Sequence, residues 1–327
     1  MHVIFLRGSV PPAHEHPEKL VYDTIDNCED MWTQLFYYYL KESGNTGELI
    51  YEGSSRGLRV DNRFTELWVP SIKHYKPHKK PGMIICRGGF RYYEPFLRRY
   101  PKVKKVYYGA GKRFYPQGYD EYDLILTDSP RQLEVIQKKK KPAALFIKPA
   151  ATLFKPVSTE KTYDICFMAN ATQSRIKRHE LLLNAFAGSE FRILNLGNYD
   201  KRLRQLAKRL NVIIKWGGWH RRKQLPRLIS SCRVGICCST NYDSCPRVIP
   251  EYLACNLPVV VTSNINFWDE QYINKDTGIL ATEDELIDAV KALLKLRPKP
   301  RRYYESNLSM ECAARYLDGL IRSYVLK

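Results

Sequence analysis

The sequence predicts an α/β protein built from two doubly wound domains, and three observations carry this prediction. Short apolar runs of strand length alternate with amphipathic stretches of helix length along the 327 residues. A chain of this length can bury two separate cores. The alternation lapses near residues 149–160 (PAATLFKPVSTE), where Pro, Ser and Thr gather as they do in a linker.

The apolar runs place the individual elements. In the first domain we expect strands at 2–6, 47–51, 83–86, 104–108, 124–127 and 144–147, with helices at 28–40 and 131–138. In the second we expect strands at 163–168, 192–196, 212–216, 234–238 and 258–262, with helices at 179–186, 201–210 and 225–231. A last helix is expected at 310–324. Strands that alternate with helices at this spacing form βαβ units, so both sheets should be parallel.

Composition excludes several classes of protein. Hydrophobic residues make up 44% and charged residues 27%, as in a soluble globular protein. No apolar run approaches the ~20 residues of a transmembrane helix, and the N-terminus has no signal-peptide core. Four of the nine cysteines (Cys86, Cys166, Cys237 and Cys238) lie in apolar runs, and no C-x-x-C pair occurs. We therefore expect no integral membrane segment, no zinc site and a cytoplasmic location, with peripheral association at the inner face of a membrane left open.

The charge points to an anionic partner. Lys and Arg total 53 against 34 Asp and Glu, which gives a formal net charge of +19. Phosphorylated substrates, an anionic membrane surface or nucleic acid would each fit. A soluble protein with a basic surface and no such partner is the alternative.

The most informative run is NYDSCPRVIPEYLACNLPVVVT, residues 241–262. Asp243 and Glu251 have seven residues between them, and an apolar β-branched run follows at 258–261. The pattern predicts a loop, a helix with Glu251 in its first turn, a tight turn and a buried strand. This arrangement presents backbone N–H groups to an anion and carboxylates to sugar hydroxyls.

This run resembles the donor-binding motif of the retaining glycosyltransferases with the GT-B fold, the group 1 or family 4-like enzymes. The resemblance covers most of the chain and is closest over residues 163–294. It implies two Rossmann-like domains that face each other across a cleft. Residues 1–155 would bind the acceptor, residues 156–305 would bind the nucleotide sugar, and the helix within 306–327 would cross back to the first domain.

The resemblance also assigns the donor-side residues. Glu251 would accept hydrogen bonds from the donor ribose, and Asp243 would face the sugar hydroxyls. The backbone N–H groups of Arg247 and Val248 would meet the β-phosphate. In the upstream run DICFMANATQSRIKRHELLL, Lys177 and then Arg175 are the preferred cations for the diphosphate. Asp243, Glu251 and Lys177 are the catalytic candidates.

The chain departs from the family pattern in the motif region. Asp243 stands where the family usually has Glu, and Asn170 lies roughly where it often has Arg. Asn256 replaces the usual Gly, which predicts a left-handed turn there. The run Trp216-Gly217-Gly218 lies where the family lines its nucleobase pocket; Trp216 either stacks on the base or belongs to the core.

The acceptor side is expected at Gly-rich turns that follow strands of the first domain. The candidate residues are Gly8, Gly88, Gly89, Gly109, Gly111, Lys112 and Arg113. Many family members carry a His near the strand end before Gly109, and none stands here. The family's usual mechanism, in which the departing phosphate assists deprotonation on the same face, needs no such base.

The sequence therefore predicts a glycosyltransferase that moves a sugar from a nucleotide-diphosphate sugar, with retention, without a metal and without a cofactor. The acceptor would be a glycan or a membrane lipid. Three alternatives remain open: transfer to a modified base in DNA or tRNA, a GT-B sugar-nucleotide 2-epimerase, and a catalytically silent nucleotide-sugar binding module.

Overall fold

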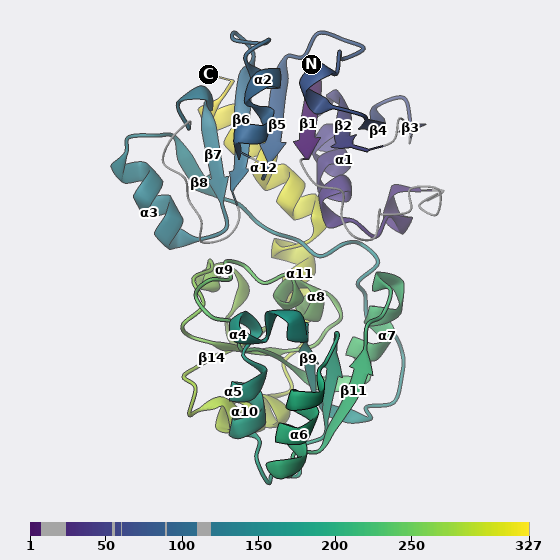
Figure 1. Ribbon diagram of the computed structural model, residues 1–327, viewed down its shortest axis with the longest axis vertical. Coiled ribbons are helices and arrows are strands. Elements are labelled where there is room, and N and C mark those ends of the chain that lie inside the picture. The colour runs from purple at the N-terminus through teal and green to yellow at the C-terminus, as the bar shows by residue number, and fades with distance from the viewer. Residues whose placement is uncertain (8–23, 54–55, 60, 89, 110–118, 327) are drawn as a thin grey trace. The chain divides into compact units, whose positions relative to one another are not determined.

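The computed structural model describes residues 1–7, 24–53, 56–59, 61–88, 90–109 and 119–326, and it divides into two compact units (Figure 1). Unit 1 comprises Met1–Thr152 and Met310–Lys327, and unit 2 comprises Leu153–Ser309. Each unit contains one sheet with helices packed against it, and each is described here by itself.

The sheet of unit 1 has the strand order β3-β4-β2-β1-β5-β6-β7-β8. All neighbouring strands are parallel except β3, which is antiparallel to β4. The strands are β1 (His2–Arg7), β2 (Thr46–Glu52), β3 (Arg56–Arg59), β4 (Phe64–Val69), β5 (Met83–Arg87), β6 (Lys104–Gly109), β7 (Leu124–Thr127) and β8 (Ala143–Leu145). The order reverses between β1 and β5, the point at which such sheets bind ligands.

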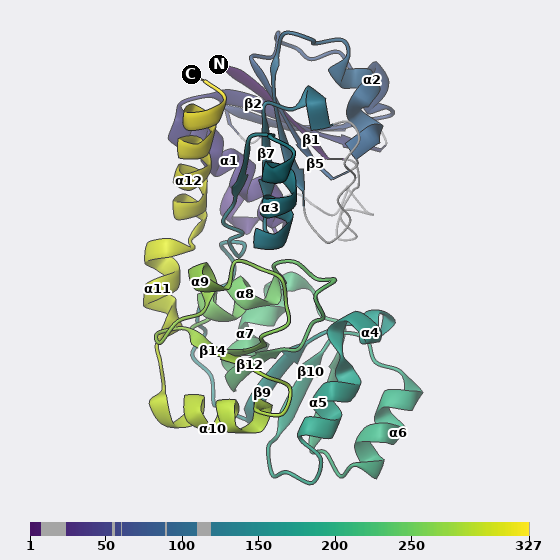
Figure 2. The same ribbon diagram turned by 90° about the vertical axis from the view of Figure 1, so that its left-hand side faces the viewer.

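Helices cover this sheet. They are α1 (Met31–Ser43), α2 (Glu94–Leu97), α3 (Pro130–Lys138) and α12 (Met310–Tyr324), with short 3₁₀ turns η3 (Ile25–Asn27), η4 (Ile72–His74), η5 (Phe90–Tyr93) and η6 (Tyr119–Glu121). The longest helices, α1 and α12, lie side by side (Figures 1 and 2). The side chain of Asp30 caps α1 by accepting a hydrogen bond from Thr33 N, and Gly44 ends the helix at φ +70°.

Unit 2 has a fully parallel sheet with the order β11-β10-β9-β12-β13-β14. The strands are β9 (Tyr163–Met168), β10 (Ile193–Leu196), β11 (Ile214–Gly218), β12 (Cys232–Cys237), β13 (Val259–Thr262) and β14 (Gly278–Ala281). This is the strand order of a Rossmann fold, with its reversal between β9 and β12.

Short helices connect these strands. They are α4 (Ser174–Lys177), α5 (His179–Ala185), α6 (Lys201–Arg209), α7 (Leu225–Ser230), α8 (Val248–Ala254), α9 (Asp269–Tyr272), α10 (Leu286–Leu296) and α11 (Pro300–Asn307), with 3₁₀ turns η7 (Ala171–Gln173) and η8 (Arg222–Gln224). Figure 2 shows α5, α6 and α10 packed around the sheet. Apolar strand residues such as Ile165, Val234 and Val260 are fully buried beneath them.

The predicted fold class is confirmed, since both units are parallel α/β sheets with alternating helices. Strands β7 and β9 have the predicted bounds, and β1, β2, β5 and β6 extend each by one or two residues. The sequence analysis missed β3, β4 and β14. The prediction placed the domain boundary after residue 155, and the first segment of unit 1 ends at Thr152. Within the expected C-terminal segment 306–327, α12 begins at Met310 and belongs to unit 1.

Candidate functional site

Two loops follow the strands at which the second sheet reverses its order. One leaves β9 and leads through η7 and α4 to α5; the other leaves β12 and leads to α8. Ligands of open α/β sheets bind outside the carboxyl ends of such a strand pair. The two loops are joined by a backbone hydrogen bond of 2.8 Å from Thr240 N to Ile176 O.

Lys177 and Asp243 meet across these two loops. The ammonium group of Lys177 forms an ion pair with the Asp243 carboxylate and lies 3.5 Å from Ser239 Oγ. Asp243 N donates to Thr240 O at 3.0 Å, which fixes the turn that carries the carboxylate. Both side chains remain partly exposed, at 19% for Lys177 and 23% for Asp243. The structure thus brings together two of the three catalytic candidates.

The backbone turns sharply directly after Lys177. Arg178 adopts φ +58°, a left-handed conformation that is costly for residues other than Gly, Asn and Asp. Its guanidinium is anchored 2.5 Å from Glu283 in the loop after β14. A hydrogen bond from Arg178 holds the pKa of Glu283 below its ordinary value. The anchor and the turn together direct Lys177 toward Asp243.

Glu251, the third catalytic candidate, lies in the first turn of α8 and is buried. Its carboxylate Oε1 is 2.6 Å from Nη2 of Arg222, the first residue of η8. The Arg222 guanidinium also lies 5.0 Å from the centre of the Phe154 ring, a cation–π contact. The sequence analysis did not identify Arg222. The only local signal was the basic run HRRKQ at a strand end.

Tyr252 fastens α8 to the sheet. Its hydroxyl accepts a hydrogen bond from Met168 N at 2.8 Å and donates to Cys166 O at 3.2 Å, both on β9. A Cβ on Gly235 would come within 2.5 Å of the Tyr252 ring, so the missing side chain makes room for it. The predicted left-handed turn after α8 is confirmed, with Asn256 at φ +58°. These contacts hold Glu251 at a fixed position above the strand ends.

The run Trp216-Gly217-Gly218 ends β11. Trp216 is half-buried, packs against the core of unit 2 and lies 5.5 Å from the ring of Tyr199. Gly218 has φ +78°, and its carbonyl accepts from Gly197 N at 2.8 Å. Gly197 in turn approaches Ala169 so closely that a Cβ would lie 2.3 Å from Ala169 O. The described contacts of Trp216 are those of a core residue.

The remaining donor-side candidates lie at helix ends. Arg175 is exposed on α4, Arg247 is exposed at the N-cap of α8, and Val248 is the half-buried first residue of that helix.

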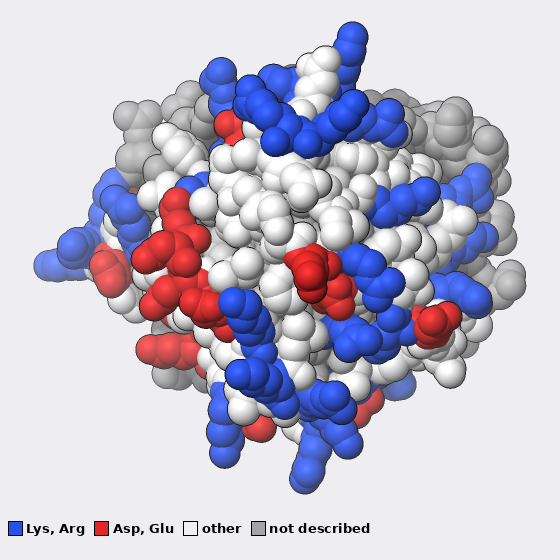
Figure 3. All heavy atoms as spheres, turned by 90° about the horizontal axis from the view of Figure 1, so that it is seen from below, with Lys and Arg blue, Asp and Glu red and all other residues white. Residues whose placement is uncertain are grey.

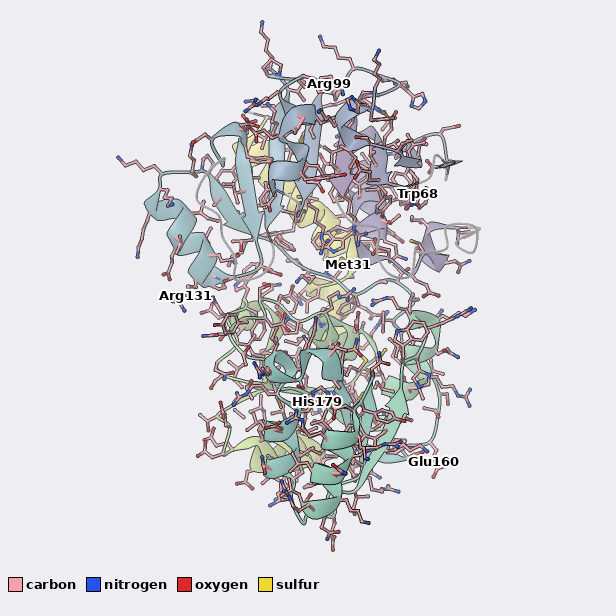
Figure 4. All side chains as sticks on the ribbon, in the orientation of Figure 1. Met31, Trp68, Arg99, Arg131, Glu160 and His179 are labelled. Carbon is pink, nitrogen blue, oxygen red and sulfur yellow. The ribbon has the colours of Figure 1, made fainter. Side chains whose placement is uncertain are left out.

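Next to this site, His179 begins α5 and is buried (Figure 4). Its ring meets the Phe167 ring edge-on at 5.1 Å. Burial lowers the pKa of His179, while the Ala169 backbone and Asp200 oppose this effect. The imidazole is therefore neutral in the folded protein at neutral pH.

On unit 1, two of the acceptor-side candidates are described. Gly88 follows β5 at φ +62°, and Gly109 is the buried last residue of β6. The other candidates, Gly8, Gly89, Gly111, Lys112 and Arg113, lie outside the described residues.

Residues 150–309 match the family model described as "Glycosyl transferases group 1". The chain carries a group 1 glycosyltransferase domain. It is accordingly a glycosyltransferase, and the carboxylates of the motif lie within the matched region. Comparison with curated protein sequences gives no match.

Solved structures share the fold of the whole glycosyltransferase chain. Sucrose-phosphate synthase from Thermosynechococcus elongatus aligns with a TM-score of 0.71 at 15% identity and covers 99% of each chain. A glycosyltransferase from Rickettsia africae aligns at 0.69 with 15% identity and covers 98% of each chain. Anabaena HepE in complex with UDP aligns at 0.70 with 12% identity, covering 99% of this chain and 100% of HepE. The fold is thus the GT-B fold.

Two further observations concern the described part of this glycosyltransferase. None of its helices combines the length and hydropathy needed to span a bilayer. All nine cysteines are free thiols, of which eight are buried and Cys312 is partly exposed.

Proposed function

We propose that this glycosyltransferase binds a nucleotide-diphosphate sugar at the carboxyl edge of the second sheet and transfers the sugar with retention. The observation that carries the proposal is that both motif carboxylates form ion pairs at this edge. Asp243 pairs with Lys177, and Glu251 pairs with Arg222. Ribose and sugar hydroxyls are donors that such oriented carboxylates accept, and the cations suit the phosphates.

Each group has a role in the proposed reaction. Glu251 accepts hydrogen bonds from the ribose hydroxyls, and Asp243 accepts them from the transferred sugar. Lys177, together with the exposed Arg175, stabilises the charge that grows on the diphosphate as the glycosidic bond breaks. The departing phosphate oxygen takes the acceptor proton on the same face, so the reaction retains the anomeric configuration. With cations in this role, we propose that the reaction needs no divalent metal.

A uridine nucleotide is the first donor to test. Structures of Anabaena HepE, which share the fold of this chain, are described as complexes with UDP and with UDP-glucose. Trp216 and the glycine turn after it lie at the carboxyl end of β11, the edge strand of the sheet, which β10 separates from β9 at the switch point. We propose a UDP-sugar as the donor.

The acceptor is proposed to be a glycan or a membrane lipid at an anionic surface. Positive charge is plentiful on unit 2, where five of the nine residues of α6 are Lys or Arg. On the face in Figure 3, Lys and Arg side chains are spread around the surface, whereas Asp and Glu gather in smaller patches. Such a distribution attracts anionic partners over a broad area.

Thermal unfolding with UDP, GDP, CMP, ADP and dTDP tests the donor site. A ligand present at 100 times its dissociation constant adds about 2.7 kcal/mol of stability, which raises the unfolding midpoint by a few degrees. We expect a rise with one nucleotide that disappears in Glu251→Gln. A matched control is Glu180→Gln, because Glu180 pairs with Arg202 on the exposed surface of the same unit. No rise with any nucleotide would contradict the proposal.

Product analysis tests the reaction. Nuclear magnetic resonance of the product formed from an α-linked donor should show an α-linkage, and activity should persist in EDTA. A rearranged sugar nucleotide from donor alone would instead identify an epimerase.

A further inference from the structure

A cavity of about 540 Å³ lies in unit 1 at the edge of the sheet where β6 and β7 begin. Its walls come from the turn between α2 and β6 and from the segment that links η6 to β7. Substrates of open α/β sheets bind at the opposite edge, outside the carboxyl ends of the strands. The cavity is therefore not at the substrate edge of this sheet, and its volume is typical of a site for a small molecule.

Lys105, the second residue of β6, is a buried cation on the wall of this cavity. The residue is 6% exposed, and its ammonium group donates one hydrogen bond, of 3.4 Å, to Pro101 O. It forms no ion pair with a carboxylate among the residues that the structure describes. An ammonium group has three N–H donors, and burial of a charge is costly unless the charge is paired. The cavity thus contains a cation that has no counter-ion in the described part of the unit.

Two carboxylates on the cavity wall are already engaged. Asp123 Oδ1 accepts a hydrogen bond from Lys104 Nζ at 3.1 Å, and its Oδ2 accepts one from the backbone N of Lys105 at 2.8 Å. Asp120 forms an ion pair with Lys141. Both carboxylates therefore have a lysine partner other than the ammonium group of Lys105.

The remaining charges on the cavity wall are positive in sum. Arg98 is paired with Glu94, four residues earlier in the chain. Lys102 and Glu121 are exposed, and neither forms an ion pair with another described residue. The positive charges of Lys102 and Lys105 are therefore opposed by the one carboxylate of Glu121. A cavity with this balance of charges attracts an anion.

We infer that this cavity binds a phosphate ester, either of a small molecule or of a lipid headgroup, at Lys105. The ammonium group of Lys105 donates to the phosphate oxygens, and Lys102 adds a second positive charge at the surface. A phosphate monoester carries a charge of about −1.5 to −2 at neutral pH, which two lysines match. The proposed donor site lies in unit 2, so the phosphate ester is a second ligand, and the inference does not depend on the proposed reaction.

Titration calorimetry with small anions tests the site. Inorganic phosphate, glycerol 3-phosphate and uncharged glycerol are titrated into the protein in the presence of saturating UDP, which occupies the proposed donor site. We expect both anions to bind and glycerol not to bind. Lys105→Met, which removes the charge and keeps a long unbranched side chain, should weaken anion binding roughly ten- to hundredfold. Equal anion binding by the parent protein and Lys105→Met would overturn the inference, as would a parent protein that binds no anion.

Glu121→Gln should have the opposite effect. It removes the carboxylate that repels an anion, so it should strengthen anion binding severalfold. Weaker anion binding in Glu121→Gln would contradict the placement of the anion in this cavity.

Arg99→Met is the matched control for the loss of one positive charge. Arg99 follows Arg98 in the same turn (Figure 4), but it lies outside the cavity wall. Its guanidinium is held on the rings of Phe96 and Tyr100, at 5.4 and 5.6 Å from their centres. This variant should bind the anions as the parent protein does. An equal loss of binding in Arg99→Met and Lys105→Met would show that net charge, and not the cavity, holds the anion.

Thermal unfolding distinguishes loss of the site from loss of the fold. Without an anion, Lys105→Met should unfold at or above the midpoint of the parent protein, because it removes a buried charge that has no counter-ion. Glycerol 3-phosphate should raise the midpoint of the parent protein and leave that of Lys105→Met unchanged. A rise of the same size in both proteins would overturn the inference.

Vesicles distinguish the two sources of the phosphate ester. Lys105-dependent binding to phosphatidylcholine vesicles that contain phosphatidic acid would identify a lipid headgroup. Lys105-dependent binding of glycerol 3-phosphate, without binding to these vesicles, would identify a free phosphorylated metabolite.

Discussion

The guanidinium of Arg222 lies 2.6 Å from the carboxylate of Glu251 and 5.0 Å from the ring centre of Phe154. The Phe154 ring limits the orientations of the Arg222 side chain, and Arg222 in turn limits those of the Glu251 carboxylate. Glu251 is only 5% exposed, so without Arg222 a buried carboxylate would lose its ionic partner. Arg222 thus positions the group that we assign to the donor ribose.

We expect Arg222→Met to weaken nucleotide binding by about tenfold or more, because Glu251 loses its orientation. Arg222→Lys should weaken nucleotide binding less, because lysine keeps the positive charge and loses only the fixed geometry of the guanidinium. Titration calorimetry with the nucleotide identified by thermal unfolding measures both. Arg227→Met, a change on the exposed surface of the neighbouring helix α7, is the control. Unchanged affinity in Arg222→Met would show that Glu251 does not depend on its partner.

The left-handed turn at Arg178 predicts which of two variants at this position is the more stable. Arg178→Gly removes the contact with Glu283 and relieves the backbone strain, whereas Arg178→Ala removes the contact and keeps the strain. Arg178→Gly should therefore be more stable than Arg178→Ala by about 1 kcal/mol in urea unfolding. Glu283→Gln, which leaves the turn unchanged, should cost no more than about 1 kcal/mol because Glu283 is half exposed. The reverse order of Gly and Ala would contradict this account of the turn.

His179 makes the stability of unit 2 depend on pH. Its folded pKa lies below the ordinary 6.5, mainly because of burial, so the unfolded chain binds more protons below that pH. The stability is complete above pH 6.5 and falls as the pH decreases below it, by at most about 1.4 kcal/mol per pH unit for one proton. Neighbouring Asp200 opposes the shift, and Arg202 and Lys177 add to it.

Urea unfolding at several pH values checks the His179 prediction. The free energy of unfolding of His179→Gln should change less between pH 7 and pH 5 than that of the parent protein. His74→Gln, a change at an exposed residue of unit 1, should leave the pH dependence as it is. Parallel curves for the parent and His179→Gln would rule out His179 as the source.

Replacing Gly278 and Gly319 with alanine should change the free energy of unfolding in opposite directions. A Cβ at Gly278 would lie 2.1 Å from Val259 O of the neighbouring strand, so Gly278→Ala should destabilise by about 1–3 kcal/mol. Gly319 lies in α12 with nothing within 4 Å of its Cβ. Gly319→Ala should stabilise by about 0.5–1 kcal/mol, because alanine favours the helix. Urea unfolding measures both, and a loss of stability in Gly319→Ala would contradict the prediction.

The sequence predicted most strands because a strand buried on both faces is an unbroken apolar run. Strand β4 was missed because Thr65 and Glu66 interrupt its apolar residues, although Glu66 is fully buried. Strand β14 was missed because it is only four residues long and begins with Gly278. Local pattern cannot show that a neighbouring strand will cover such residues.

Prediction of the donor-side residues from the sequence was limited in a similar way. Asp243 and Glu251 share one motif, and the resemblance supplied Lys177. Arg222 lies 29 residues before Glu251, and Lys177 lies 66 residues before Asp243. In each case, only the order of the strands brings the two residues together. The chemistry of a single loop could be predicted from the sequence, whereas partners from different loops required the fold.

Unit 1 is discontinuous in the sequence, and this bears on how the protein is made. The strands and α1 come from Met1–Thr152, whereas α12, which lies along α1, comes from Met310–Lys327 and is synthesised after all of unit 2. All of unit 2 emerges in between and is continuous, so it can complete its core first. During translation, the side of α1 that α12 will cover remains exposed to chaperones and to other nascent chains. The core of unit 1 is therefore completed only when α12, which is made after unit 2, docks onto elements that were made before it.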